Sequence, residues 1–237
     1  MDLKQLTQMY DFTGKTVVIT GGAGILGGEI ACTLVECGAK VAIVDLDPSL
    51  ADRLTDRLES GVGQAIVLHG NVLEPDSLEE TARQVTEAFG QIDCLINGAG
   101  GNSPIATTGP DQPFFELPAD ALRFVCELNI IGTILPSQVF GRYMAGQGEG
   151  VILNISSMNA LRPLTKIPAY SAAKAAVSNF TQWLAVHMAQ EYSHTIRVNA
   201  IAPGFFLTLQ NKFLLTDEVT GELTPRGQSI IGHTPMG

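Results

Sequence analysis

The sequence has few basic residues, and this scarcity limits the partners that the protein can bind. Lys and Arg together number 14 among 237 residues, against 24 Asp and Glu, so the formal net charge is −10 at pH 7. Proteins that bind nucleic acid or an anionic membrane normally carry a basic surface. The composition therefore argues against both partners, and any anionic substrate must be held by a few local cations.

Cysteine, paired histidines and long apolar runs are also scarce. The four cysteines have neither C-x-x-C spacing nor the density of a disulfide scaffold, so they are expected to be reduced. The four histidines are dispersed, and no metal site is expected. No apolar run approaches the roughly 20 residues that span a bilayer, and the N-terminus lacks the apolar core of a secretion signal. We therefore expect a soluble, cytoplasmic protein.

Short β-branched runs alternate with longer amphipathic stretches. The runs are compact and apolar, as strands buried on both faces of a parallel sheet must be. They are Thr16–Thr20, Lys40–Asp45, Gln64–His69, Ile92–Ile96, Val151–Ile155 and Thr195–Ala200. The expected helices are Ile25–Cys37, Pro48–Ser60, Pro75–Phe89, Pro118–Ala145 and Ala169–Glu191. This alternation predicts an α/β fold with a Rossmann-type, doubly wound parallel sheet and helices on both faces.

No internal repeat, low-complexity segment or linker divides the chain, so residues 1–237 are expected to form a single nucleotide-binding catalytic domain. Pro136 lies inside the fourth expected helix and should kink or divide it. Two segments rich in Gly and Pro, Gly98–Pro118 and Pro203–Gly237, are expected to lack regular structure. Because functional loops follow the carboxyl ends of parallel strands, the second is a candidate substrate loop or lid.

A glycine-rich turn joins the first expected strand to the first long helix. Gly22, Gly24 and Gly27 match G-x-G-x-x-G, whose glycines permit a tight turn, close approach to a pyrophosphate and close helix–strand packing. The helix N-terminus then offers free N–H groups to phosphates. Asp45 ends the next strand, where an acid accepts hydrogen bonds from the adenosine ribose and repels a 2′-phosphate. This pattern favours NAD over NADP; the alternative is that Asp45 is only a turn residue.

Tyr170 and Lys174 lie four residues apart in the last long helix, thirteen residues after Ser157. Residues at this spacing share a helix face, so the ammonium of Lys174 can act on whatever Tyr170 touches. A nearby cation favours the phenolate and is expected to lower the tyrosine pKa from about 10 toward neutrality, where proton transfer is efficient. The spacing alone is also common in amphipathic helices, and the nucleotide-binding pattern upstream favours a catalytic pair.

Taken in order, these motifs resemble the classical short-chain dehydrogenase/reductase family over nearly the whole chain. Asn97-Gly98-Ala99-Gly100 and Pro203-Gly204 belong to the same resemblance. It implies an NAD(P)-dependent oxidoreductase that acts on CH–OH groups. The implied catalytic residues are Asn129, Ser157, Tyr170 and Lys174. The implied cofactor contacts are Gly21, Gly22, Gly24, Ile25, Leu26, Asp45, Asn71, Val72, Asn97, Ala99, Gly100, Tyr170, Lys174, Pro203, Gly204 and Thr208.

The resemblance also gives the catalytic residues their roles. Tyr170 is the general acid in ketone reduction and the general base in alcohol oxidation, and Lys174 lowers its pKa and hydrogen-bonds the nicotinamide ribose. Ser157 stabilises the substrate oxygen, with the adjacent Ser156 as a competitor for this role. Asn129 holds a water that connects the lysine to solvent.

Two departures from the family pattern concern its adenine site and its end. Asn71 replaces the acid that usually contacts adenine, and its carbonyl can still accept from the adenine amine. The family continues beyond Gly237 through another helix and a final strand, so the C-terminal strand is expected to be missing from this sequence.

Several loop segments resemble the D-mannonate oxidoreductase (fructuronate reductase) branch, which interconverts D-mannonate and D-fructuronate. A sugar acid needs polar partners for its hydroxyls and a cation for its carboxylate. The candidate substrate residues are Asn102, Ser103, Ser157, Asn159, Arg162, Lys166 and Phe205. Two alternatives remain: a short-chain dehydrogenase for another sugar, polyol or 3-oxoacyl substrate, and a catalytically silent nucleotide-binding protein.

The fourth and fifth expected helices have apolar residues to spare after core packing. Members of the family commonly pair these helices across a dimer and then form tetramers. The resemblance therefore implies a homo-oligomer, either a dimer or a tetramer.

Overall fold

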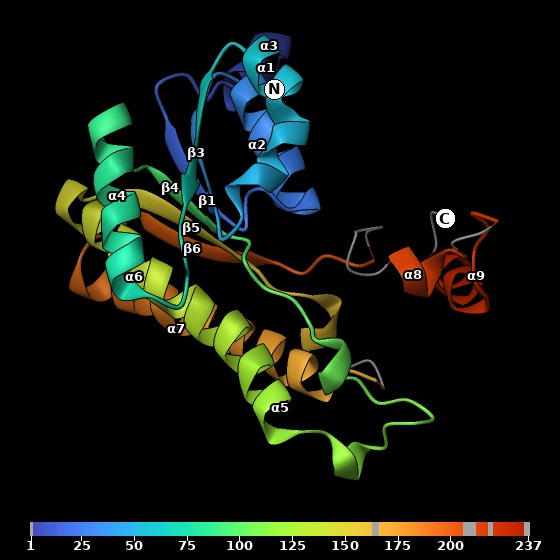
Figure 1. Ribbon diagram of the computed structural model, residues 1–237. Coiled ribbons are helices and arrows are strands. Elements are labelled where there is room, and N and C mark those ends of the chain that lie inside the picture. The colour runs from blue at the N-terminus through green and yellow to red at the C-terminus, as the bar shows by residue number, and fades with distance from the viewer. Residues whose placement is uncertain (1, 163–165, 206–211, 218–219, 235–237) are drawn as a thin grey trace. The chain divides into compact units, whose positions relative to one another are not determined.

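The computed structural model describes residues 2–162, 166–205, 212–217 and 220–234, and it contains one parallel sheet (Figure 1). The strands are β1 (Thr16–Thr20), β2 (Lys40–Asp45), β3 (Gln64–His69), β4 (Cys94–Asn97), β5 (Gly150–Ile155) and β6 (Ile196–Ile201). Their order is β3-β2-β1-β4-β5-β6, and every neighbouring pair is parallel. The predicted Rossmann-type sheet is confirmed. The strand order reverses direction between β1 and β4, the position where such sheets bind ligands.

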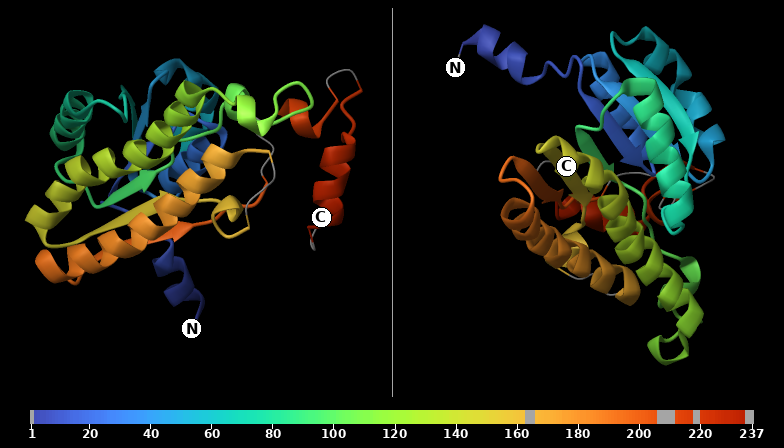
Figure 2. Two further views of the ribbon diagram at one scale, coloured as in Figure 1. Left: turned by 90° about the horizontal axis from the view of Figure 1, so that it is seen from below. Right: turned by 90° about the vertical axis from the view of Figure 1, so that its left-hand side faces the viewer.

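Alternate residues of the central strands enter two separate apolar cores. Val17 and Ile19 of β1 pack with α2 (Ile25–Glu36), whereas Val18 lies in the opposite core. Three long helices share that second core: α4 (Pro75–Phe89), α6 (Gly132–Gln147) and α7 (Pro168–Glu191). Figure 2 shows these helices on one face of the sheet and α2 with α3 (Thr55–Ser60) on the other. Both faces are therefore covered, as the apolar runs require.

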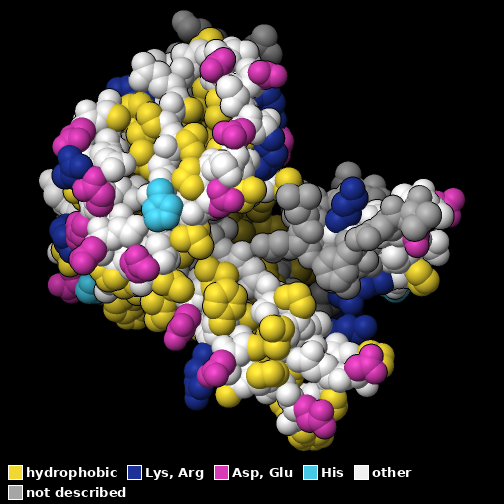
Figure 3. Space-filling model, viewed as in Figure 1, with side chains coloured by type: hydrophobic (Ala, Val, Ile, Leu, Met, Phe, Trp, Pro, Cys, Tyr) yellow, Lys and Arg dark blue, Asp and Glu magenta, His cyan; other side chains and the backbone are white. Residues whose placement is uncertain are grey.

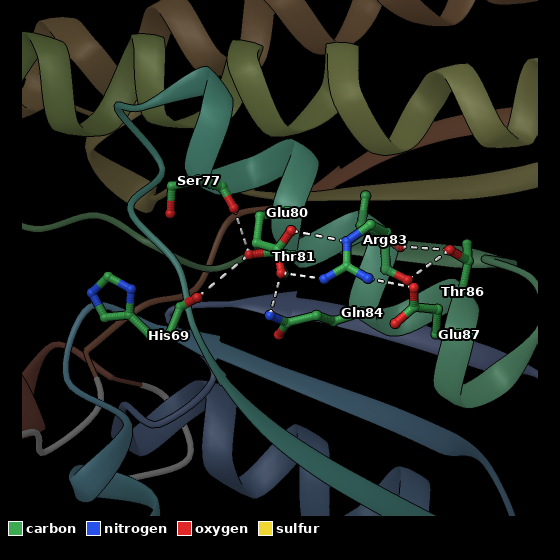
Figure 4. Close-up of polar contacts among 9 residues, drawn as sticks. His69, Ser77, Glu80, Thr81, Arg83, Gln84, Thr86 and Glu87 are labelled. Carbon is green, nitrogen blue, oxygen red and sulfur yellow. Dashed lines mark hydrogen bonds and ion pairs between the residues drawn. The ribbon is translucent and has the colours of Figure 1, made fainter.

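The helix α4 illustrates which contacts hold the helices on the sheet (Figure 4). Its exposed face carries Arg83 between Glu80 and Glu87, at spacings that bring side chains together on a helix. On its buried face the Thr81 hydroxyl donates to the carbonyl of Ser77 and, at 3.4 Å, to that of His69 in β3. The surface ion pairs contribute little to stability, so the buried apolar face holds the helix in place.

The long stretch around Pro136 is divided, as the sequence predicts, but the irregular segment lies before the proline. Helix α5 (Ala119–Cys126) leads into a π-helical turn, Glu127–Ile131, and Pro136 itself lies inside α6. The 29-residue stretch Ala119–Gln147 has the length and the mean hydropathy, 1.3, of a membrane span. Half of its most apolar window is buried within the protein, and core helices of soluble proteins pass the same test.

Two further differences from the expected elements have local causes. The segment Pro48–Ser60 is a 3-10 helix, Pro48–Leu54, followed by α3. An unexpected helix, α1 (Leu3–Met9), begins at a capping box in which Asp2 and Gln5 each accept a hydrogen bond from the other's backbone N–H.

The chain forms two compact units, Met1–Ala202 and Pro203–Gly237. The first contains the sheet. In the second, α8 (Lys212–Leu215) and α9 (Pro225–Gly232) are connected through a bridge between Thr216 and Leu223. The assignment of residues 1–237 to a single domain stays a prediction.

Candidate active site

The turn after β1 is built from glycines that leave no room for side chains. Gly21 has a left-handed φ of +63°, and a Cβ there would lie 2.7 Å from the backbone N of Ala99 in the loop after β4. A Cβ on Gly27 would lie 2.5 Å from the Gly21 carbonyl oxygen. Gly21 therefore supplies the tight turn that the motif assigns to its first glycine, Gly22, and Gly27 supplies the close helix packing.

The N-terminus of α2 fits the phosphates of a dinucleotide. Gly24 is the N-cap residue, and it provides no side-chain acceptor for the first-turn N–H groups of this 12-residue helix. A Cβ on Gly24 would meet only the Gly21 carbonyl oxygen, at 3.1 Å, so this side of Gly24 is otherwise open. Ile25 and Leu26 open the helix at this point. Unpaired N–H groups and the positive end of the helix dipole favour an anion.

Asp45, at the carboxyl end of β2, lies against this turn. One carboxylate oxygen accepts from the Ala23 N–H at 3.1 Å, and the other accepts from the Asp47 N–H at 3.3 Å. The carboxylate is therefore fixed beside the glycine-rich turn, where the sequence places an acid for the adenosine ribose.

Two predicted cofactor contacts, Asn97 and Asn71, have side chains that hydrogen-bond to other groups of the protein. Asn97 is 2% exposed, and its amide nitrogen donates to Ser137 Oγ at 3.0 Å and to Asn154 Oδ1 at 2.8 Å. In Asn71 the carbonyl expected to accept from adenine accepts from the Leu73 N–H at 3.0 Å, as an Asx turn does. Val72, the next contact in that loop, is buried against Gly132. The amide nitrogen of Asn97 is thus committed to the protein, and its contact with a cofactor stays a prediction.

Lys174 is buried beside the loop that follows β4. The residue is only 4% exposed, and its ammonium donates to the Ile155 carbonyl at 2.8 Å. Gly100 lies directly against this group, because a Cβ on Gly100 would be 3.2 Å from Lys174 Nζ and 2.7 Å from Asn129 Oδ1. Burial lowers the pKa of Lys174 to about 8.

Asn129 lies in the π-helical turn and is fully buried. Its amide nitrogen donates to the carbonyls of Gly101 and Val125, both at 2.7 Å, and its amide oxygen accepts from the Gly101 N–H at 3.2 Å. The side chain therefore holds the loop after β4 against the helix. A water bound at Asn129 stays a prediction.

The structure distinguishes the two adjacent serines at the end of β5. Ser156 faces α7, and its hydroxyl is within 2.6 Å of Ser178 Oγ and donates to the Lys174 carbonyl. Ser157 instead accepts from the backbone and side-chain N–H groups of Asn159, at 3.2 and 3.3 Å, and hydrogen-bonds Tyr170. The hydroxyl beside the tyrosine is thus that of Ser157.

The expected lowering of the Tyr170 pKa is wrong for this structure. Burial of the phenol raises its pKa, and the hydrogen bond with Ser157 opposes that shift. The Lys174 ammonium is 5.6 Å from the centre of the tyrosine ring and is directed at the Ile155 carbonyl. Desolvation of the phenolate therefore outweighs any attraction by the cation.

A buried polar network beneath the cluster was not predicted. Asn154 of β5 receives a hydrogen bond from Asn97 and donates to Thr181 Oγ1 of α7 at 2.9 Å. Ser137, the other acceptor of Asn97, donates to the Thr133 carbonyl at 2.7 Å. The sequence feature that indicates this network is a pair of polar residues, Asn154 inside one apolar run and Asn97 directly after another. Bonds of this kind tie β4 and β5 to the helices that carry the candidate catalytic residues.

The predicted substrate residues are only partly brought together. Asn159 is buried and bonded to Ser157, whereas Arg162 and Lys166 are exposed. Asn102 donates to Thr107 Oγ1 at 2.7 Å, within the loop after β4 that also contains Ser103. Pro203, Gly204 and Phe205 belong to the second compact unit, and Thr208 lies outside the described residues. Their assigned roles stay predictions.

Within the described part of the chain, no group of three or more His, Cys, Asp or Glu side chains could hold a metal ion.

Comparisons with known proteins show the family of this chain. A family model described as short chain dehydrogenase matches residues 15–218. A structure from Haemophilus influenza with bound NAD, provisionally assigned as a D-mannonate oxidoreductase, is 42% identical with a TM-score of 0.87, over 98% of this chain and 85% of that one. In Escherichia coli (strain K12), 7alpha-hydroxysteroid dehydrogenase is 32% identical over 94% of this chain and 80% of its own length. The 5-keto-D-gluconate 5-reductase of the same strain is 30% identical over 90% and 80%.

Proposed function

We propose that this chain, which belongs to the short chain dehydrogenase family and is an oxidoreductase, uses NAD to interconvert a sugar-acid alcohol and its ketone. The observation that carries the proposal is the cluster of buried Ser157 and Lys174 with half-buried Tyr170 beside the loop after β4. That loop contacts the glycine-rich turn at Gly21, so groups for proton transfer and for nucleotide binding adjoin each other. A binding protein without turnover has no need of this arrangement.

NAD suits the residues at the glycine-rich turn and at the end of β2. The N-terminus of α2 is the proposed site for its pyrophosphate, and Asp45 is the proposed acceptor for its adenosine ribose hydroxyls. The carboxylate of Asp45 would repel a 2′-phosphate, which supports NAD over NADP. The bound NAD of the Haemophilus relative gives the same preference.

In the proposed reaction, the nicotinamide supplies or accepts the hydride, and side chains of this protein handle the proton. Tyr170 donates a proton to the ketone oxygen during reduction and accepts it during oxidation. Its raised pKa keeps the phenol in the protonated form near neutral pH in the protein without cofactor. Ser157 donates a hydrogen bond to the same oxygen, because its own oxygen already accepts from Asn159.

The remaining two residues support the proton donor. Lys174 places a buried amino group next to Gly100 and behind the tyrosine ring, with a pKa of about 8 that lets it hold or release a proton near physiological pH. Asn129 fixes the loop after β4 and is proposed to hold a water that connects Lys174 to solvent.

D-mannonate and D-fructuronate are the proposed substrate pair. The Haemophilus structure assigned to this activity and the relative that acts on 5-keto-D-gluconate both point to sugar acids. Asn102, Ser103 and Asn159 are proposed partners for the sugar hydroxyls. Arg162 and Lys166 are exposed cations in the segment that leads to Tyr170, and we assign them to the carboxylate.

A substrate panel tests this assignment. D-fructuronate should be reduced with NADH faster than other keto acids, polyol-derived ketones, a 3-oxoacyl thioester and a 7-oxosteroid. Preferential reduction of the steroid would instead favour a second candidate function, that of a hydroxysteroid dehydrogenase, because the chain is also 32% identical to such an enzyme. Binding of NADH without turnover of any ketone in the panel would contradict both.

We also propose a cytoplasmic homo-oligomer, a dimer or a tetramer. Apolar side chains lie exposed near and along α5 (Figure 3), among them Phe115, at 94%, and Phe124, at 50%. On α7, Trp183 is 57% exposed and stacks against His187. Exposed apolar surface of this kind supports association. A monomeric mass at micromolar concentration in analytical ultracentrifugation would contradict the proposal.

A further inference from the structure

Arg53 is the first basic residue after Asp45, and its guanidinium is folded back onto the glycine-rich turn. It lies in the 3-10 helix Pro48–Leu54, on the chain segment that follows β2. One terminal nitrogen donates to the Ala23 carbonyl at 2.6 Å, and the other donates to the Gly24 carbonyl at 2.9 Å. A third bond, to the Leu50 carbonyl at 2.6 Å, fixes the guanidinium to its own helix. Arg53 thus bridges two consecutive carbonyls of a turn that is 30 residues away.

Gly28 makes room for this bridge. A Cβ on Gly28 would lie 3.1 Å from a terminal nitrogen of Arg53 and 2.8 Å from Leu54 Cδ1. Gly28 immediately follows the last glycine of G-x-G-x-x-G and is not required by that motif. Its absent side chain is explained by the approach of the 3-10 helix to α2.

Arg53 and Asp45 hold the two ends of the same residue. The Ala23 N–H donates to Asp45, and the Ala23 carbonyl accepts from Arg53. The backbone that leads into the N-cap of α2 is therefore fixed by one anion and one cation, each through a charge-assisted hydrogen bond.

The position of this cation is unfavourable for the helix alone. A positive charge at a helix N-terminus opposes the helix dipole. The same charge becomes favourable when an anion occupies that N-terminus. The unfavourable interaction of this charge with the helix dipole is thus consistent with a ligand-binding role for Arg53 rather than a purely stabilising one.

We infer that Arg53 is a positioning residue for the dinucleotide: it holds Ala23 and Gly24 in the conformation that presents the first N–H groups of α2 to the pyrophosphate. This inference rests on the proposed function of the glycine-rich turn. It also explains why a basic residue close to Asp45 need not create an NADP site, because three of its five N–H donors bond carbonyls of the turn and of its own helix.

The test compares Arg53→Met with Arg53→Lys and with Arg57→Met as the matched control. Arg57 also reaches α2, but it pairs with Glu29 and Glu36, away from the turn. Binding of NADH is measured by its fluorescence, and kcat is measured at saturating NADH. Arg53→Met should raise the Kd for NADH about tenfold or more, the usual effect of losing hydrogen bonds from a charged group, with kcat within about twofold. Arg53→Lys keeps the charge but lacks the planar fork of two terminal nitrogens, so its Kd for NADH should lie between those of the wild type and Arg53→Met. Arg57→Met should leave the Kd unchanged.

An unchanged Kd for NADH in folded Arg53→Met, with only a lower stability to urea, would overturn the inference and leave a structural role. If Arg53→Met does not fold, Arg53→Lys decides in the same way. Failure of the wild-type protein to bind NADH would instead contradict the proposed function itself. Loss of residual NADPH binding in Arg53→Met, with an unchanged Kd for NADH, would also overturn the inference, because it would show that the cation serves a 2′-phosphate.

Discussion

The two halves of the site are built in opposite ways. After β1, the proposed phosphate site consists of main-chain groups, and its geometry depends on glycines whose missing side chains allow Gly21 to touch Ala99. After β4 and β5, the proposed catalytic site consists of side chains, with Ser157 and Lys174 nearly buried and linked to the backbone by hydrogen bonds. A shape made by the backbone is lost when a side chain is added. A site made by side chains is lost when one functional group is removed.

The variant Tyr170→Phe distinguishes the two halves most clearly, because it should abolish turnover and spare NADH binding. Removal of the hydroxyl takes away the proposed proton donor, so kcat should fall by about 10² to 10⁴. The Kd for NADH should stay within about twofold, because the proposed phosphate site is unchanged. Tyr192→Phe is the matched control, since Tyr192 is 58% exposed and packs on His187 away from the cluster. Near-normal turnover by Tyr170→Phe would contradict the assignment.

The paired serines give the next largest effect. Ser157→Ala should lower kcat by about 10² to 10³, the usual cost of losing a donor to a developing alkoxide. Ser156→Ala loses its contacts with Ser178 and the Lys174 carbonyl, so it should lower the free energy of unfolding by about 1 kcal/mol while kcat changes by less than tenfold. Steady-state kinetics and urea unfolding of both variants check this contrast. Equal loss of turnover in the two would show that the geometry does not distinguish them.

The backbone-built half is tested with two glycines. Gly21 and Gly14 both have left-handed φ values, +63° and +81°, but a Cβ on Gly14 would meet nothing within 4 Å. Gly14→Ala should therefore cost only the conformational penalty, about 1–2 kcal/mol in unfolding free energy, without affecting NADH binding. Gly21→Ala adds a clash with Ala99, and it should destabilise the protein further and weaken NADH binding at least about tenfold. Equal behaviour of the two variants would show that the contact between the loops is unimportant.

The smallest predicted effect is a pH dependence of stability. Because burial lowers the pKa of Lys174 to about 8, the folded protein binds fewer protons at this group than the unfolded chain between about pH 8 and 10.5. Stability should therefore rise with pH, by about 1 kcal/mol from pH 7 to 9, in urea unfolding without added nucleotide. The raised pKa values of Cys94, about 12, and of Cys32 act in the opposite direction once thiols of the unfolded chain ionise, from about pH 8, so the lysine contribution is the difference between the wild type and Lys174→Met. The rise should be absent in Lys174→Met, and its persistence in that variant would assign it to another group.

The strands and the glycine-rich turn could be predicted because they depend on local sequence. The apolar runs of β1, β2 and β3 have the predicted ends, since each run is bounded by Gly, Asp or other turn-forming residues. The capping box of α1 was also a local signal, Asp2 followed by Gln5, but it was not recognised in a segment without apolar periodicity.

The remaining features depend on packing between distant segments. The π-helical turn forms where Asn129 bonds to Gly101, a contact that no local pattern contains. The sign of the Tyr170 pKa shift depends on burial against residues such as Ala106 and Val125. The reach of Arg53 to Ala23 depends on how the segment after β2 folds over α2. Spacing in the sequence indicates which side chains can meet, whereas their protonation and orientation follow from what surrounds them.

A crystal structure with NAD and D-mannonate bound tests the central claim most directly. The account predicts that the pyrophosphate lies at Gly21–Leu26 and that the Tyr170 hydroxyl, next to Ser157, faces the nicotinamide ring at hydrogen-bonding distance from a substrate oxygen. A nicotinamide ring remote from Tyr170, with its hydroxyl directed to bulk solvent, would contradict the account.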